Sequence, residues 1–241
     1  MNTLNQQTAL EQAARKHTKD SHALGGDAGR LDHFYRGWAS SYDLGLADGY
    51  CGRMIAAEMA AAVQTAYLAR HRTAMAILDA GCGTGPVGVE LESLRFRLID
   101  GFDLSEEMAE KAQQTRAYRN VRGDVDLIGL PSDYFRASYD LTVCCGVFTL
   151  GHVGPDGLRE LARVTRSNGF VIASDRKRYA EATSFEDHVR LLQDEGVLIP
   201  AQYLRNGRYA ADEDAHCWVL ADAQKDQSNK RTGCDQATSY R

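Results

Sequence analysis

Residues 76–85, which read AILDAGCGTG, decide the fold of this chain. Their apolar start is typical of a strand that is covered on both faces of a sheet. Gly81, Gly83 and Gly85 then allow positive φ angles and a close approach of the backbone to a ligand. Pro86 suits the first turn of a helix, where its missing N–H costs nothing. We therefore expect a buried strand, a glycine turn, and a helix whose first N–H groups face a ligand.

The spacing of the glycines distinguishes between two kinds of ligand. Dinucleotide sites use G-x-G-x-x-G, whereas this turn reads G-x-G-x-G and continues with Pro86. Asp79 precedes the glycines and would place a negative charge beside a pyrophosphate, which disfavours NAD. The same charge suits a ligand that carries an ammonium group, such as S-adenosylmethionine. An NAD-dependent oxidoreductase is therefore the weakest of the function classes considered.

A second acid follows at the expected end of the next strand, over residues 96–102. Asp103 lies 20 residues after Gly83, the spacing at which an acid meets a ribose. A carboxylate at this position can accept hydrogen bonds from both ribose hydroxyls, whereas the alternative is a solvated loop residue. Ser105 is a good N-cap for the helix that follows. The turn and Asp103 together favour a nucleoside ligand.

This combination resembles motif I and the ribose-binding acid of class I S-adenosylmethionine-dependent methyltransferases. Residues 31–43 resemble the F-Y-x-x-W-A-x-x-Y-D stretch of small-molecule methyltransferases, which covers cofactor and substrate. Residues 158–174 resemble the family segment L-x-E-L-x-R-V-x-K-P-G-G, with Ser167-Asn168 in place of Pro-Gly. Residues 151–153, Gly-His-Val, resemble the tripeptide that follows the fourth strand in the Williams–Beuren-syndrome-region methyltransferase-like group. The resemblance spans residues 31–223.

The resemblance also implies which residues hold the cofactor. An acid after the third strand would bind the adenine amino group, and the next backbone N–H would meet a ring nitrogen; Asp124 and Val125 match these roles. Asp126 is a competing acid, and a polar turn is a further alternative. Cys145 and Gly146, at the end of the fourth strand, would make backbone contacts. The residues expected at the cofactor are Asp79, Gly81, Cys82, Gly83, Gly85, Asp103, Leu104, Asp124, Val125, Cys145 and Gly146.

Three side chains are candidates for catalysis. His152 follows the strand expected at 139–148, and ligands bind outside the carboxyl ends of such strands. Its ordinary pKa near 6.5 allows it to accept a proton, so we expect a base or a group that positions the nucleophile. The alternative is a histidine that satisfies backbone groups before Pro155. Tyr35 and Tyr42 are expected to close over the same space, because buried hydroxyls need partners.

Composition limits the remaining possibilities. The chain has 241 residues and a net charge of −5, which argues against a nucleic-acid partner. Its six cysteines show no C-x-x-C pair and no metal-ligand spacing, so we expect reduced thiols, no metal and a cytoplasmic location. No apolar run is long enough to suggest a membrane span.

Strands that alternate with helices predict an α/β fold. We expect a doubly wound, Rossmann-like, mostly parallel seven-stranded sheet, a final antiparallel strand pair and an N-terminal helical lid. The expected division is a flexible arm over 1–30, a methyltransferase domain over 31–224 with its lid at 31–70, and a disordered tail over 225–241. The oligomeric state stays open.

Three expectations concern individual helices. A helix over 52–70 is predicted to bury a face made of Met54, Ile55, Met59, Val63, Ala66 and Tyr67. Residues 176–179 read as a basic loop, with a clamp for an anionic substrate as the alternative. Ser184 and Asp187 are predicted to form a capping box for a helix that Gly196 ends.

The expected function is methyl transfer from S-adenosylmethionine to a small molecule, by in-line attack on the sulfonium methyl. The alternative is a protein of the same fold that binds S-adenosylmethionine or S-adenosylhomocysteine without transferring the methyl group.

Deletion of residues 225–241 tests the expected domain division. This segment contains no Ile, Leu, Val, Phe or Trp, so it cannot bury enough apolar surface to offset the entropy of ordering. The truncated protein should keep the melting temperature and the cofactor affinity of the full chain, measured by thermal unfolding and calorimetry. A clear loss of either property would show that the tail docks on the domain.

Overall fold

The computed structural model describes residues 13, 16–39, 42, 51–130, 137–210 and 213–223. The strands are β1 (Ala76–Ala80), β2 (Leu98–Phe102), β3 (Asn120–Arg122), β4 (Tyr139–Phe148), β5 (Thr165–Arg176), β6 (Leu198–Ala210) and β7 (Glu213–Asp222). The helices are η1 (His22–Leu24), α2 (Ala28–Trp38), α4 (Gly52–Tyr67), η2 (Arg72–Ala74), α5 (Pro86–Ser93), α6 (Glu106–Gln114), α7 (Gly157–Val164), α8 (Lys177–Thr183) and α9 (Phe185–Asp194).

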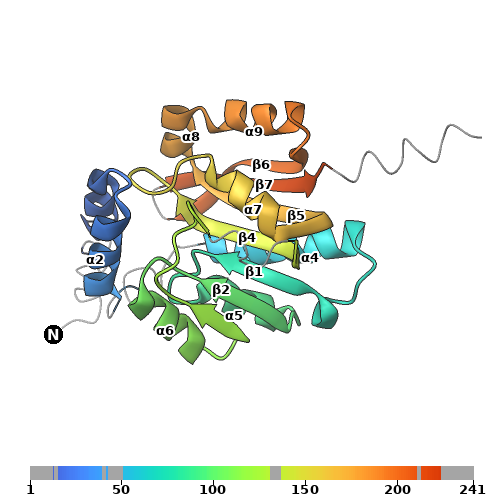
Figure 1. Cartoon of the computed structure of the whole chain (residues 1–241), viewed down its shortest axis with the longest axis horizontal. Coiled ribbons are helices and arrows are strands. Elements are labelled where there is room, and N and C mark those ends of the chain that lie inside the picture. Colours follow the sequence, from blue (N-terminus) through green and yellow to red (C-terminus); the bar gives the residue numbers. More distant parts are fainter. Residues whose placement is uncertain are drawn as a thin grey trace, which may run out of the picture.

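The strands form one sheet in the order β3-β2-β1-β4-β5-β7-β6 (Figure 1). Strands β1 to β5 pair in parallel, whereas β7 is antiparallel to both β5 and β6. Helices cover both faces, so the prediction of a doubly wound, mostly parallel sheet with a final antiparallel pair is confirmed.

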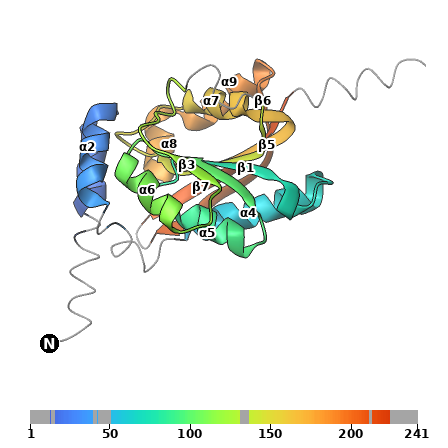
Figure 2. The same ribbon diagram turned by 60° about the horizontal axis from the view of Figure 1, so that its bottom comes forward.

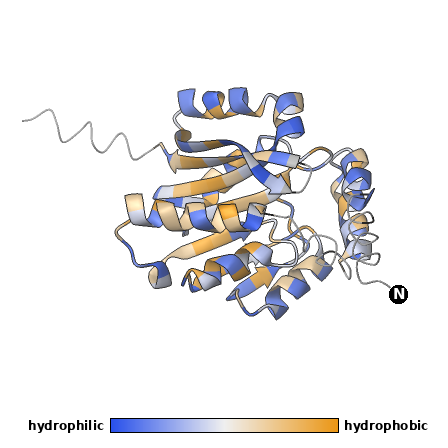
Figure 3. Ribbon diagram, turned by 180° about the vertical axis from the view of Figure 1, so that it is seen from behind, coloured by the Kyte–Doolittle hydropathy of each residue, from blue (hydrophilic) through white to orange (hydrophobic). Residues whose placement is uncertain are grey.

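Two apolar layers hold the helices on the sheet. Alternate residues of β1 contribute to opposite layers, because successive strand side chains point to opposite faces. Ile77 packs in the layer that includes α4 and α5, and Leu78 in the layer that includes α7, α8 and α9. Figure 2 shows the sheet between these helices, and Figure 3 shows mostly hydrophobic residues along its central strands. This double burial explains why the sequence of β1 is continuously apolar up to Asp79.

The position of β1 determines where a ligand can bind. The strand order reverses at β1, which lies between β2 and β4. Ligands of open α/β sheets bind outside the carboxyl ends of the strands at such a switch point. Helix α2 stands across this end of the sheet, beside α6 and the loop after β4 (Figure 1). An ion pair of 3.3 Å joins Arg36 of α2 to Glu107 of α6.

The buried face of α4 differs from the prediction. Val63 is buried as predicted, but Met54 and Tyr67 are 43% and 42% exposed. The other buried residues of this helix are Gly52, Ala56, Ala57 and Ala60. These small side chains let the helix lie close to the sheet, and the larger residues lie at its rim. Helical spacing identified the helix, but residue size decided which face turns inward.

Two further helix predictions need correction. Residues 177–183 form α8 rather than a basic loop. Ser184 lies between α8 and α9 in the left-handed conformation, with φ of 50°, and its side chain makes no capping hydrogen bond. The predicted capping box is therefore wrong, because Ser184 turns the chain between two consecutive helices. Gly196, with φ of 69°, follows α9 as expected.

Much of the expected flexible arm is helical where the structure describes it. Residues 16–21 are helical and lead into η1, and α2 begins at Ala28. The ring of His17 stacks on Trp38 of α2 with centroids 5.0 Å apart, and Ser21 is buried. Residues 1–12, 14, 15, 40, 41 and 43–50 and the expected tail at 225–241 lie outside the described residues. Within the described part, no helix has the length and apolar character to cross a membrane.

A substitution at Gly88 in α5 tests the packing beneath the glycine turn. A Cβ atom at Gly88 would lie 2.2 Å from Cζ of the buried Tyr118 ring. Gly88→Ala should therefore destabilise the protein by about 1–3 kcal/mol through overpacking, although alanine favours helices. Denaturant unfolding measures this change.

Gly37→Ala in α2 is the matched control, because no described atom lies within 4 Å of its added Cβ. It should be neutral or stabilise the protein by up to about 1 kcal/mol. Equal effects at the two positions would contradict the packing argument.

Candidate active site

The glycine turn joins β1 to α5 and is fixed by the end of β2. Backbone N–H groups of Gly81 and Cys82 both donate to the Phe102 carbonyl at 2.9 Å. Gly81, Gly83 and Gly85 have φ angles of 72°, 55° and 95°, as the sequence predicts. A Cβ at Gly81 would lie 2.3 Å from Val147, whereas a Cβ at Gly83 would meet no described atom within 4 Å. Gly83 thus borders the space in which a ligand can approach the backbone.

Asp79 lies buried beneath this turn, with 1% of its surface exposed. Its Oδ2 accepts a hydrogen bond of 2.7 Å from the Tyr118 hydroxyl, which itself accepts one of 3.0 Å from Gly88 N–H. Its Oδ1 has no hydrogen-bond partner among the described residues. Burial raises the pKa of Asp79 to about 7. A cationic ligand group would supply the compensation that the negative form of this carboxyl lacks.

Sequence reasoning missed Tyr118. Its ring occupies the space where Cβ atoms of Gly85, Gly88 and Gly101 would lie, at 3.0, 2.2 and 3.1 Å from ring atoms. These glycines come from the turn, from α5 and from β2, so their shared neighbour is not apparent from local spacing. The ring supports the turn from below, and its hydroxyl holds Asp79.

Asp103 links the end of β2 to the turn. Its Oδ2 accepts a hydrogen bond of 2.8 Å from Gly83 N–H, and its Oδ1 accepts one of 3.0 Å from Ser105 N–H. Each carboxylate oxygen keeps a second lone pair that can accept a ribose hydroxyl. Burial raises the pKa of Asp103, and backbone hydrogen bonds from Ser105, Gly83 and Leu104 oppose this effect. Leu104 lies between these contacts, and Ser105 caps α6 through Met108 N–H, as predicted.

The residues expected at the adenine lie where β3 ends. Asp124 is exposed and has a φ of 52°. The Val125 N–H donates to the Asp103 carbonyl at 3.0 Å, so in this structure it is not available to an adenine nitrogen. The competing Asp126 accepts from Ile128 N–H at 2.9 Å within a turn. Asp124 is therefore the acid that presents its side chain outward.

The end of β4 meets the turn directly. Cys145 is buried, and Gly146 has a φ of 87° where the pairing of β4 with β5 is irregular. The Gly146 N–H donates to Ser174 Oγ at 3.0 Å, so this N–H is not available to the cofactor. Val147 follows and packs on Gly81. The bulge thus sets the distance between β4 and the glycine turn.

Tyr35 of α2 and His152 of the loop after β4 come together in the structure. The Tyr35 hydroxyl lies 2.7 Å from His152 Nε2, and His152 Nδ1 lies 2.9 Å from the Leu150 carbonyl. Because a carbonyl only accepts, the neutral ring carries its proton on Nδ1, and Nε2 accepts from Tyr35. Burial lowers the pKa of His152 to about 4 and raises that of Tyr35 to about 12. Both groups are neutral at pH 7.

Two neighbours complete this cluster. The ring of Tyr42 lies 6.3 Å from that of Tyr35 and 4.7 Å from that of Trp38. His22, which the sequence did not identify, lies with its Nε2 3.0 Å from Thr149 Oγ1. Burial lowers the pKa of His22 to about 4 as well. Helix α2 and the segment before it therefore close over the loop after β4.

Comparison with known proteins supports a methyltransferase. Residues 77–169 match the family model described as "Methyltransferase domain", which includes the turn, Asp103 and His152. No curated protein sequence matches the chain significantly.

Three solved structures are similar in fold. A TehB-like S-adenosylmethionine-dependent methyltransferase from Corynebacterium glutamicum has a TM-score of 0.53 and 20% identity, covering 81% of this chain and 97% of its own. Magnesium protoporphyrin IX methyltransferase from Synechocystis, solved with bound S-adenosylhomocysteine, has a TM-score of 0.51 and 19% identity. The match covers 71% of this chain and 84% of that protein. A [4+2]-cyclase has a TM-score of 0.50 and 16% identity, and the match covers 69% of this chain and 81% of the cyclase.

At these identities the solved structures establish the fold alone, and the domain match adds the enzyme class. Residues 77–169 thus match a methyltransferase domain, in agreement with the predicted enzyme class, and a structure of similar fold holds S-adenosylhomocysteine, the product of the expected cofactor.

Asp103→Ala tests the expected ribose contact. The variant should weaken binding of S-adenosylhomocysteine by about 1.5–3 kcal/mol, the scale for hydrogen bonds to a charged group, or about ten- to a hundredfold in Kd. Calorimetry measures the affinity, and Asp194→Ala, at an exposed position of α9, is the control. An unchanged Kd in folded Asp103→Ala protein would show that this residue does not bind the ribose.

Proposed function

We propose that the protein transfers the methyl group of S-adenosylmethionine to a small molecule held at the Tyr35–His152 pair. The observation that carries this proposal is the 2.7 Å contact between the Tyr35 hydroxyl and His152 Nε2. It places a polar donor–acceptor pair after the carboxyl end of β4, where the ligand crevice of this fold lies. Helix α2 contributes the tyrosine, so the substrate would lie beneath the N-terminal segment.

The cofactor would bind across the turn. Gly83 leaves room beside the backbone, the remaining lone pairs of Asp103 suit the ribose hydroxyls, and buried Asp79 balances the positive charge of the amino acid end. Asp124 is the candidate for the adenine amino group. S-adenosylmethionine supplies a sulfonium methyl that is already activated, so the protein mainly has to orient the nucleophile. Such orientation can contribute about 7–11 kcal/mol.

The neutral state of the pair suits this task. A substrate hydroxyl or amine can donate to Tyr35 Oη, whose own proton is directed at His152 Nε2. The lone pair of the nucleophile then forms a bond to the methyl carbon while the C–S electrons pass to sulfur, and the proton that the nucleophile no longer needs leaves to solvent after the transfer. An imidazolium here would repel the sulfonium, and the low pKa of His152 prevents that repulsion. We therefore assign Tyr35 and His152 to positioning the nucleophile rather than to strong base catalysis, with Tyr42 bordering the same space.

A protein that binds the cofactor without methyl transfer is the second candidate. The similar fold of a [4+2]-cyclase favours keeping it, because the fold alone does not determine the reaction. Membership of the Williams–Beuren-like group is a further proposal, supported by the aromatic stretch and by Gly-His-Val.

Methyl transfer to an acceptor separates the two candidates, and His152→Ala then tests the role of the pair. Small-molecule extracts are screened with methyl-labelled S-adenosylmethionine to identify an acceptor, and the rate is then measured in each variant. His152→Ala should leave S-adenosylhomocysteine affinity within about twofold and lower kcat by about a hundredfold, the scale for a misplaced nucleophile. Tyr35→Phe should lower kcat in the same direction, because it removes the hydroxyl and keeps the ring.

His33→Ala on the exposed side of α2 is the control and should change neither quantity. Full turnover in both His152→Ala and Tyr35→Phe would contradict the assigned role. Cofactor binding without any labelled product would favour the second candidate.

A further inference from the structure

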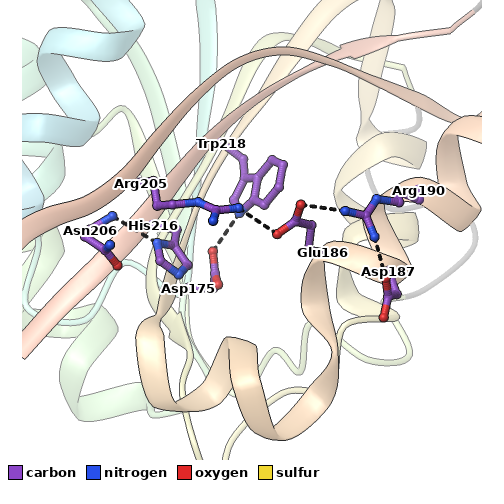
Figure 4. Close-up of polar contacts among 8 residues, drawn as sticks. All are labelled: Asp175, Glu186, Asp187, Arg190, Arg205, Asn206, His216 and Trp218. Atoms are coloured by element: carbon purple, nitrogen blue, oxygen red, sulfur yellow. Dashed lines mark hydrogen bonds and ion pairs between the residues drawn. The ribbon is translucent and has the colours of Figure 1, made fainter.

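A groove of about 460 Å³ lies away from the crevice, between α8 and α9 on one side and β6 and β7 on the other. Small-molecule pockets have volumes of about 300–1,000 Å³. Its lining shares no residue with the predicted cofactor site or with the Tyr35–His152 cluster. Figure 4 shows its polar residues, with Asp175 beside His216, its pairing partner in the register of β5 and β7.

Asp175 is the least satisfied group in this groove. It is 1% exposed, and its Oδ1 accepts a hydrogen bond of 2.7 Å from Trp218 Nε1. Its Oδ2 is buried and has no hydrogen-bond partner in the described part of the chain. A buried carboxylate oxygen without a donor is costly, so a ligand that donates to it would be stabilised.

The charges around Asp175 favour a cation over an anion. Four acidic and three basic side chains line the groove. Two of the bases, Arg190 and Arg205, are both paired with Glu186, at 2.7 and 3.0 Å. Arg190 also pairs with Asp187 at 2.6 Å, so two carboxylates balance these two arginines, whereas Asp175 keeps an uncompensated oxygen. Burial raises the pKa of Asp175 to about 7, as expected for a carboxyl that lacks a cationic partner.

Aromatic rings provide the apolar part of the lining. Tyr203 and Trp218 stack with centroids 3.8 Å apart, and the ring of His216 meets Tyr203 edge-on at 5.7 Å. His216 Nδ1 accepts from Asn206 N–H at 3.0 Å, so its neutral ring keeps the proton on Nε2. The Cζ atom of Arg205 lies over the Tyr203 ring, 5.3 Å from its centroid, so the rings provide apolar surface rather than a free face for a cation. An unpaired carboxylate beside apolar rings suits an organic ammonium group.

We propose that this groove binds a small organic molecule with a primary ammonium group, which donates to Asp175 Oδ2 while its apolar part contacts the aromatic wall. The site is separate from the methyl-transfer crevice but linked to it. The hydroxyl of Tyr179 in α8 donates to the Val153 carbonyl at 2.7 Å, in the loop that carries His152. Occupancy of the groove can thus reach the crevice loop through α8.

Three probes that differ in charge test the proposal on the full-length protein. Tyramine carries the ammonium group, para-propylphenol replaces it with a methyl group, and para-hydroxyphenylpropionate carries a carboxylate. Titrations are followed by calorimetry and by the indole N–H NMR signals of the two tryptophans. Tyramine should bind about tenfold or more tightly than the other two probes, and should shift the Trp218 signal but not that of Trp38.

Asp175→Asn removes the charge with little change in size and should weaken tyramine binding by about tenfold or more. Asp187→Asn is the matched control, because Asp187 lines the same groove but its side chain is 70% exposed and paired with Arg190. It should change the affinity by less than about twofold. Both variants should bind S-adenosylhomocysteine as the wild type does, which separates this test from that of methyl transfer.

Several results would overturn the proposal. The wild type would not bind tyramine, or it would bind the neutral or anionic probe equally or more tightly. An unchanged affinity in Asp175→Asn would also contradict the proposal. The comparison of probes uses only wild-type protein, so it decides the question even if Asp175→Asn fails to fold.

Discussion

A buried negative charge beneath the glycine turn is the constraint on which the site depends. Asp79 lies on the central strand, where water cannot solvate it, and Tyr118 provides its hydrogen bond. The Tyr118 ring depends most on Gly88, where an added Cβ would lie 2.2 Å from it, whereas an added Cβ at Gly85 or Gly101 would lie at a tight 3.0 or 3.1 Å. The glycines thus serve two purposes: Gly85, Gly88 and Gly101 make room for the tyrosine, and Gly83 makes room for a ligand. The other oxygen of Asp79 is left for a cation.

Two contacts hold α2 and the segment before it against the loop after β4. Tyr35 reaches His152 from the helix, and Gly26 N–H donates to the Gly151 carbonyl from the segment before it. A Cβ at Gly151 would lie 2.5 Å from the carbonyl oxygen of His22, so only glycine allows this approach. Helix α2 is therefore matched to the loop after β4, and both polar groups of the pair are partly buried. Their neutral state follows from this burial.

The sequence predicted the parts of the structure that depend on local patterns. Apolar runs and the glycine turn indicated β1, β2 and β4, and the spacing between Gly83 and Asp103 corresponds to a hydrogen bond in the structure. Packing that joins distant segments was not predictable in this way. Tyr118 lies 39 residues from the carboxylate that it binds, and the buried face of α4 was decided by small residues rather than by methionines. Ser184 was predicted to be an N-cap because the sequence did not reveal the preceding helix, Lys177–Thr183, which ends directly before it.

The charge on Asp79 is also the most direct test of the account. Selective labelling of aspartate with carbon-13 allows the Asp79 carboxyl to be titrated by NMR, with Asp79→Asn used to assign its signal. Without ligand its pKa should be near 7, because burial penalises the ionised form. With S-adenosylhomocysteine bound the pKa should fall, because the ligand's ammonium group stabilises the negative carboxylate. A pKa that stays the same or rises in the complex would contradict the claim that Asp79 is the counter-charge of the cofactor.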